Sequence, residues 1–190
     1  MLHQLRPALI ILGLFILLTG LVYPLSVTGV AQIFFNHQAN GSLVRVEGAV
    51  AGSELIGQPF SDPRYFWGRP SATPGFPYNA ANSSGSNYGP SNPDLKAAVQ
   101  ARIDALRTVD PGNTRPIPVD LVTASASGLD PHISVAAALY QAERVSRYRG
   151  MSTQAVIEQI NEKTEGRQFG ILGEPRVNVL ELNLALDKLS

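Results

Sequence analysis

The stretch Ala8-Leu-Ile-Ile-Leu-Gly-Leu-Phe-Ile-Leu-Leu-Thr-Gly-Leu-Val22 determines how this chain is organised. No Lys, Arg, Asp or Glu occurs between Arg6 and Arg45, so the uncharged region extends well beyond the quoted run. A helix needs about 20 residues to cross the roughly 30 Å hydrocarbon core of a bilayer. Pro24 would bend such a helix without necessarily ending it. We therefore expect one transmembrane helix over about residues 8–35.

Two alternatives are open for this segment. A cleaved signal peptide needs a short apolar run followed by a site of small residues, which Gly29-Val-Ala31 provides. Against cleavage, the apolar character resumes at once in Ile33-Phe34-Phe35, and aromatic side chains are common where a helix leaves the membrane. A core helix of a soluble protein is the second alternative, but its flanks should be amphipathic and these are not.

The composition bounds what the rest of the chain can be. After a membrane anchor at residues 1–36, residues 37–190 suffice for a single soluble domain with its own core. The chain has 15 basic and 15 acidic residues and a formal net charge of +0, so nucleic acid is not an expected partner. Cysteine is absent and the three histidines are scattered, so we expect neither disulfides nor a metal site.

The basic residues around the anchor predict its orientation. Arg6 precedes the apolar run, and no Lys or Arg follows before Arg45. Since basic residues are enriched on the cytoplasmic side of membrane helices, we expect the N-terminus in the cytoplasm and the soluble domain on the outer side.

Residues 42–47 alternate and contain β-branched residues, which predicts a strand, and residues 49–56 predict a second strand after a turn. Residues 57–93 are dense in proline and glycine, which excludes a long helix or a central strand. The same stretch carries many aromatic residues, which disordered linkers usually lack. We expect an ordered loop with a binding role, a floppy linker being the alternative.

Helical patterns dominate the second half of the chain. Capping residues and apolar periodicity predict helices over 93–109, over 135–149, from Ser152 to before Gly166, and over 177–187. Early strands and late helices indicate an α+β fold. The complete prediction is one N-terminal transmembrane helix and a single mixed domain, with a small β-sheet, a long Pro/Gly/aromatic loop and three to four helices.

The motifs of nucleotide-hydrolysing enzymes are missing. The sequence has no Gly-x-x-x-x-Gly-Lys-Ser/Thr loop, no Gly-x-Gly-x-x-Gly after a strand and no Asp-Lys-Thr-Gly-Thr phosphorylation site. Ser127, Asp130 and His132 could be drawn as a hydrolase triad, but their closeness in sequence is not evidence of one. Residues 123–131 could form an anion-binding nest or, more simply, a turn whose hydroxyls bond to their own backbone.

Polar residues recur on the helix predicted over 135–149. Tyr140, Gln141, Glu143, Arg144 and Arg147 would form one polar face, with Glu143 and Arg147 spaced as an i,i+4 ion pair. This face is either solvated or a surface for a ligand or partner, and the residues alone do not decide between the two.

Several of these stretches resemble the C subunit of the Kdp potassium-transporting ATPase, in order and over nearly the whole chain. The matching stretches are Leu5-Arg-Pro-Ala8, Gln38-Ala-Asn-Gly-Ser42, Gly52-Ser-Glu-Leu-Ile-Gly-Gln58, Tyr65-Phe-Trp-Gly-Arg-Pro-Ser-Ala72, Tyr78-Asn79, Gly85-Ser-Asn87, residues 123–131, Gln141-x-x-Arg144-Val145 and residues 177–187.

The resemblance implies an accessory, non-catalytic subunit of a bacterial inner-membrane complex that takes up K⁺ at the expense of ATP. The implied partners are a P-type pump subunit, a channel-like K⁺ subunit and a small membrane peptide. The family is described as a catalytic chaperone that raises the ATP affinity of the pump subunit. By resemblance we expect Gln141, Ser125, Ser127 and Asp130 to be associated with nucleotide.

We expect the long loop to dock onto a partner subunit through seven residues: Tyr65, Phe66, Trp67, Arg69, Pro70, Tyr78 and Asn79. A domain outside the membrane cannot touch cytoplasmic ATP, so the orientation argument conflicts with direct nucleotide binding. The alternative function is therefore a structural cap on the outer side of the channel-like subunit, without nucleotide contact.

Overall fold

The computed structural model describes residues 2–189, which divide after Leu43 into two compact units. The sequence-based boundary at residues 36/37 falls earlier than this division. A short helix, α3 (Asn36–Ala39), comes just after the apolar helix that ends at Phe34. Side chains at both ends of α3 form hydrogen bonds to the apolar helix. Asn36 and Asn40 each donate a side-chain hydrogen bond of 3.2 Å to the Gln32 Oε1 atom.

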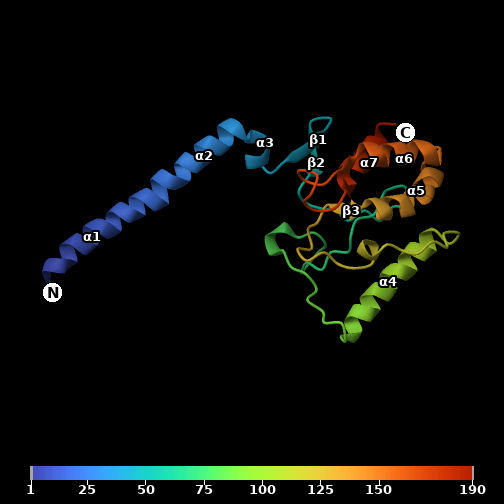
Figure 1. The fold of residues 1–190 in the computed structure, drawn as a ribbon, viewed down its shortest axis with the longest axis horizontal. Helices are drawn as coiled ribbons and strands as arrows, with labels where there is room; N and C mark the ends of the chain where they lie inside the picture. The colour runs from blue at the N-terminus through green and yellow to red at the C-terminus, as the bar shows by residue number, and fades with distance from the viewer. Residues whose placement is uncertain (1, 190) are drawn as a thin grey trace. The chain divides into compact units, whose positions relative to one another are not determined.

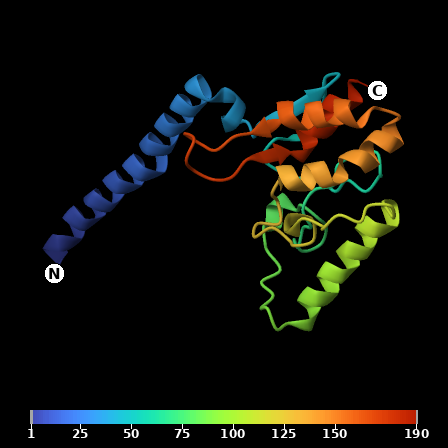
Figure 2. The ribbon, with the colours of Figure 1, turned by 45° about the vertical axis from the view of Figure 1, so that its right-hand side comes forward.

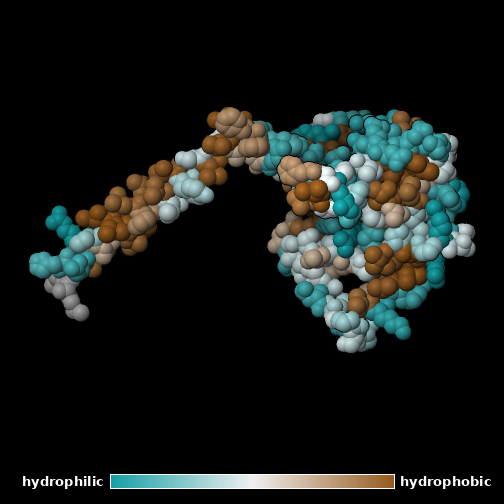
Figure 3. All heavy atoms as spheres, in the orientation of Figure 1, coloured by the Kyte–Doolittle hydropathy of each residue, from teal (hydrophilic) through white to brown (hydrophobic). Residues whose placement is uncertain are grey.

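The first unit consists mainly of apolar helix. It contains α1 (Leu2–Leu17), a π-helical turn (Leu18–Val22) and α2 (Tyr23–Phe34), which together form a continuous helix. Among the described residues this is the one helix long and apolar enough to cross a membrane, over His3–Phe34. Figure 3 shows apolar side chains along its length.

The helix continues through Pro24, as predicted. Proline has no N–H to donate to the preceding turn. The residues just before Pro24 adopt a π-helical hydrogen-bonding pattern instead of the α-helical one. The Tyr23 N–H donates to the Leu18 carbonyl, five residues back, which is the π-helical pattern. The hydroxyls of Thr19 and Ser26 donate to backbone carbonyls four residues back, both at 2.7 Å, so these polar groups are satisfied within the helix.

The second unit is α+β, as predicted (Figure 1). A hairpin, β1 (Leu43–Val46) and β2 (Ala49–Ser53), comes first. An antiparallel sheet follows in the order β3 (His132–Ser134), β5 (Arg176–Asn178), β4 (Thr164–Glu165). The helices are α4 (Pro93–Val109), α5 (Val135–Arg149), α6 (Thr153–Glu162) and α7 (Val179–Asp187), with 3₁₀ turns at Ala80–Asn82 and Val119–Leu121.

Capping side chains explain where the helices begin. Asn92 accepts a hydrogen bond of 2.8 Å at the start of α4, Ser134 one of 3.0 Å at the start of α5, and Ser152 one of 3.2 Å at the start of α6. Gly150 ends α5 in the left-handed conformation, with φ of 66°. The helices predicted over 93–109 and 135–149 are confirmed.

The three-stranded sheet was not predicted. Val177 pairs with Ile133 on one side and with Thr164 on the other, so the helix expected from residue 177 begins only at Val179. The last residue of β5, Asn178, is also the cap of α7 and accepts from the N–H of Glu181 at 3.2 Å. Such a short strand has no room to show an alternating pattern before the helix starts.

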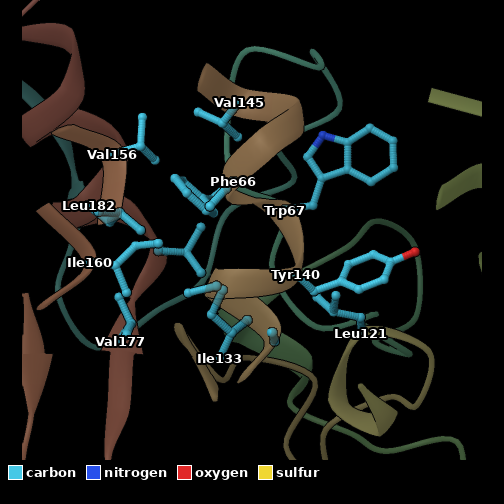
Figure 4. Close-up of a cluster of buried hydrophobic side chains, with 14 of the residues drawn as sticks. Phe66, Trp67, Leu121, Ile133, Tyr140, Val145, Val156, Ile160, Val177 and Leu182 are labelled. Atoms are coloured by element: carbon cyan, nitrogen blue, oxygen red, sulfur yellow. The ribbon is translucent and has the colours of Figure 1, made fainter. Parts of the chain in front are cut away.

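The core lies between the sheet and helices α5, α6 and α7, and the long loop enters it. Figure 4 shows Phe66 among aliphatic side chains of these helices. Phe66 is 0% and Trp67 5% exposed. Neither ring therefore presents a surface to a partner, and the docking role expected for these two side chains becomes a structural one. The core is formed by Phe66, Trp67, Leu106, Leu121, Ile133, Ala137, Ala138, Tyr140, Ala142, Val145, Val156, Ile160, Val177, Val179, Leu182 and Leu186.

Candidate functional site

Two buried amide side chains hold the long loop to the helices. On α5, Gln141 Oε1 accepts from the Trp67 N–H at 2.9 Å and Nε2 donates to the Trp67 carbonyl at 3.1 Å. On α7, Asn183 Oδ1 accepts from the Phe66 N–H at 2.8 Å and Nδ2 donates to the Phe66 carbonyl at 3.0 Å. Each amide supplies the donor and acceptor that a neighbouring strand would supply. We call Gln141 and Asn183 the amide clamp.

Arg144 extends this network from the next turn of α5. Its guanidinium donates to Gln141 Oε1 at 2.7 Å, to the Tyr65 carbonyl at 3.0 Å and to the Pro63 carbonyl. Burial lowers the pKa of Arg144 to about 10, which leaves the side chain charged at neutral pH. The guanidinium carbon lies 5.0 Å from the centroid of the Trp67 ring, within cation–π range.

Arg102 on α4 holds the same aromatic residue. Its guanidinium carbon is also 5.0 Å from the Trp67 ring centroid, and it donates to the carbonyls of Gly68 at 2.9 Å and Leu121 at 3.0 Å. Burial lowers the pKa of Arg102. Cations from two helices and amides from two helices thus hold the backbone around Trp67 in one position.

The polar face expected on α5 is only partly solvated. Tyr140, Gln141 and Arg144 are buried, whereas Glu143 and Arg147 are exposed. The expected pair between Glu143 and Arg147 was wrong. Arg147 pairs at 2.7 Å with Asp110, and Glu143 lies 3.6 Å from Arg115, because each of these two α5 residues finds its partner outside α5.

The loop over residues 123–131 follows the simpler of its two interpretations. The Ser127 hydroxyl accepts from the Leu129 N–H at 3.1 Å, a turn bond within the loop. Buried Ser125 donates its N–H to the Pro70 carbonyl at 3.3 Å and accepts the Gly128 N–H at the same distance. The Gly128 N–H is therefore not available to an anion.

Asp130, near the end of this loop, makes several polar contacts through its carboxylate. Its carboxylate contacts the Arg69 Nη1 atom at 3.1 Å and the His132 Nδ1 atom at 3.3 Å, and it accepts the His132 N–H at 3.0 Å. Burial by itself would raise the pKa of Asp130, but the hydrogen bonds from His132 and the charge of Arg69 hold that pKa below its ordinary value. The Arg69 Nε atom is buried and has no hydrogen-bond partner among the described residues.

A pocket of about 610 Å³ opens beside Asp130. Arg69, His132, Val119 and Arg176 are among its lining residues, and its size is typical of small-molecule sites. Of the four residues expected to be associated with nucleotide, only Asp130 lines it. Gln141 lies in the clamp and the two serines lie in the turn, so the four do not form one site. Within residues 2–189, no cluster of acidic or histidine side chains is suited to a metal ion.

The other expected docking residues remain partly accessible. Tyr65, Arg69, Pro70, Tyr78 and Asn79 are half-buried. The hydroxyl of Tyr78 donates to the Arg69 carbonyl at 2.6 Å, and burial raises the pKa of Tyr78. Asn79 donates to the Pro74 carbonyl at 3.0 Å and so closes a turn.

Two notable residues were not singled out from the sequence. Phe76, in the turn closed by Asn79, was not expected to dock, although its side chain is 60% exposed. Asn183 lies within the helix predicted over 177–187, but no role was predicted for it. A single amide within Leu180-Glu-Leu-Asn-Leu184 is itself a signal, because a polar group among buried leucines must find hydrogen-bond partners.

Comparison with known proteins gives the family. A family model described as KdpC, the c chain of the K⁺-transporting ATPase, matches residues 5–188. The "Potassium-transporting ATPase KdpC subunit" of Methylococcus capsulatus is 63% identical over 189 residues, covering 100% of both chains. The proteins of the same name from Sorangium cellulosum and Herpetosiphon aurantiacus are 61% and 60% identical, covering 98% and 97% of this chain and 98% and 95% of their own. The chain therefore belongs to the KdpC family, the c chains of the K⁺-transporting ATPase, which are accessory and not catalytic subunits of that complex.

Proposed function

We propose that this chain stabilises the assembled K⁺-transporting ATPase and promotes ATP use by the P-type pump subunit. One membrane helix tethers it, and the loop over residues 57–93 docks its domain onto the channel-like K⁺ subunit. The small membrane peptide is the remaining proposed partner. The chain would act by binding, without reacting groups of its own.

The amide clamp is the observation that supports this proposal best. Gln141 and Asn183 are each 1% exposed, and together they bond every N–H and carbonyl group of Phe66 and Trp67. The backbone at Phe66 and Trp67 is thereby fixed before any partner arrives, and a preorganised segment binds at a lower entropic cost. Its accessible side chains, led by Phe76, would then form the contact.

A surface substitution tests this docking role. Deleting the loop would remove Phe66 from the core, so the cleaner variant is Phe76→Ser, which leaves the core intact. The matched control is Tyr148→Ser on α5, where an aromatic side chain is 47% exposed outside the loop. Phe76→Ser should reduce retention of this chain during purification of the complex, and Tyr148→Ser should not. Equal retention of both variants would contradict docking through the loop.

We further propose a single-pass arrangement in the bacterial inner membrane, with the N-terminus cytoplasmic and the domain on the outer side. The support is the basic residue Arg6 before the anchor and the absence of Lys or Arg until Arg45. Protease added to right-side-out vesicles should digest the domain, whereas inverted vesicles should protect it. The reverse pattern would contradict this orientation.

For ATP, we propose an indirect effect through the pump subunit. Both polar atoms of the Gln141 side chain are occupied by Trp67, which disfavours direct nucleotide contact at that residue. The pocket at Arg69 and Asp130 is the specific observation that favours the direct alternative. The full-length chain in detergent should show no saturable ATP binding. Saturable binding that is lost in Arg69→Met would support the direct alternative instead.

A further inference from the structure

The connection between β4 and β5 exposes large apolar side chains that the fold does not use. Phe169 is 90%, Ile171 75% and Leu172 55% exposed. Figure 2 shows this orange-red segment, between α6 and α7, extending away from the helices of its own domain. We call Phe169, Ile171 and Leu172 the β4–β5 tip. An exposed apolar cluster of this kind is typical of an interaction surface.

The backbone at the tip is not the one that a phenylalanine favours. The Ile171 N–H donates to the Gln168 carbonyl at 3.1 Å and closes a turn, with φ of 53° at Phe169 and 76° at Gly170. Turns with two central residues of positive φ favour Asn, Asp or Gly at both positions. Gly170 suits this turn and Phe169 does not. The turn therefore does not explain the aromatic side chain. At this exposed position with positive φ, asparagine would suit both the backbone and the contact with water, and phenylalanine suits neither.

Paired backbone bonds below the turn hold the tip in place. Gln168 and Leu172 exchange both of their N–H to carbonyl bonds, each at 2.9 Å. The side chain of Phe169 is therefore presented on a short hairpin with a defined shape. A fixed shape favours a complementary pocket, because binding then costs little ordering of the backbone.

The charges flanking the tip are neutralised in pairs. Arg167 contacts both carboxylate oxygens of Glu174, at 2.8 and 2.7 Å, and Arg176 lies 2.8 Å from Glu165. Segments that bind lipid surfaces usually carry uncompensated Lys or Arg toward anionic headgroups. This hairpin offers an apolar tip without excess positive charge, which fits an apolar protein pocket better than a lipid surface.

The length of the tether limits where such a pocket can be. Even when fully extended, residues 35–42 span at most about 30 Å between the membrane-spanning helix and the domain. A domain held this close meets the membrane subunits of its own complex at a high effective concentration. A modest apolar contact is then enough to hold it.

We propose that the β4–β5 tip docks into an apolar, uncharged pocket of a membrane-embedded subunit of the same complex, with Phe169 as the central side chain. This contact rests on the proposed function and adds a second docking element, separate in sequence from the loop that carries Phe76. Phe169 fills the pocket, and Ile171 and Leu172 cover its edge.

Photocrosslinking in the assembled complex tests the occupant directly. A benzophenone side chain placed at position 169 in native membranes should link this chain to one membrane-embedded protein subunit of the complex. The same probe at position 148, where Tyr148 is 47% exposed on α5, is the matched control and should not give that product. A product with lipid alone would overturn the proposal in favour of a lipid surface. No product in an intact complex would also overturn it.

A substitution separates docking from folding. Phe169→Asn places a residue that suits the turn, so the melting temperature of the isolated full-length chain should stay the same or rise. Retention of the chain in the complex should fall about tenfold, because a large side chain leaves its pocket. A drop in melting temperature, or unchanged retention, would overturn the proposal. If the wild-type chain itself failed to co-purify with the ATPase, the proposed function would fail instead.

Discussion

Replacing Gln141 by Leu should destabilise the domain strongly, although the two side chains are similar in size. The substitution removes the acceptor for the Trp67 N–H and the donor to the Trp67 carbonyl, and it takes one partner from Arg144. At 1% exposure, water does not replace these bonds. Each unsatisfied buried group costs about 1–3 kcal/mol, so the expected loss is about 3–5 kcal/mol.

Urea unfolding of the full-length chain in detergent measures this loss. Trp67 is the only tryptophan, so its fluorescence reports on the clamped segment, and circular dichroism provides a second probe. With a urea dependence of about 2 kcal/mol per molar, the midpoint should fall by about 2 M. The matched control is Gln154→Leu on the exposed face of α6, which should change stability by less than about 0.5 kcal/mol.

The result that would refute this reasoning is specific. If Gln141→Leu unfolded at the same urea concentration as the wild type, the amide would not be needed to hold the loop. If the same variant also weakened the ATP affinity of the assembled pump, Gln141 would have a nucleotide-related role independent of folding. Reduced ATP affinity together with a large loss of stability would instead be explained by the loosened loop.

Three further predictions follow from the same contacts. Asn183→Leu should cost about 2–5 kcal/mol in the same urea assay, because it leaves the adjacent N–H and carbonyl unpaired, and a change below 1 kcal/mol would contradict the clamp. Gly128→Ala should lower the melting temperature more than Gly150→Ala. Both glycines have φ near 67°, but of the two only Gly128 would place an added Cβ within 2.5 and 2.6 Å of other atoms. Equal effects of the two substitutions would contradict the close packing at Gly128. The pKa of Asp130 in the folded chain lies below its ordinary 3.8, so the ionised carboxylate stabilises the fold above pH 3.8. This stabilisation is lost as the pH falls through the lower pKa of the folded chain. The melting temperature between pH 5 and 3 should therefore depend less on pH in Asp130→Asn than in the wild type.

Local signals in the sequence predicted the helices well. Asn92 before Pro93, and Ser134 with Gly150, mark helix ends through bonds made within a few residues. The three-stranded sheet had no such signal, because its pairing joins residues 132–134 to 176–178, far apart along the chain. Its strands are also too short for a pattern to show.

The candidate site was predicted only in part. The aromatic residues among prolines and glycines predicted an ordered loop, and two of those aromatic residues, Phe66 and Trp67, lie in the core. Which of those residues face outward depends on α5 and α7, because Gln141 and Asn183 on these helices form hydrogen bonds to the backbone of Trp67 and Phe66. Burial of the two rings therefore could not be read from the loop itself.

The sequence by itself determined the apolar helix, the α+β class and the family. Each depends on composition or on residues close together along the chain, such as the run from Ala8 to Val22. Only the tertiary structure decided which polar side chains are buried and which apolar ones are exposed. Gln141 is enclosed and Phe169 is exposed because burial depends on what the rest of the chain brings against a side chain, and hydrophobicity alone does not specify that.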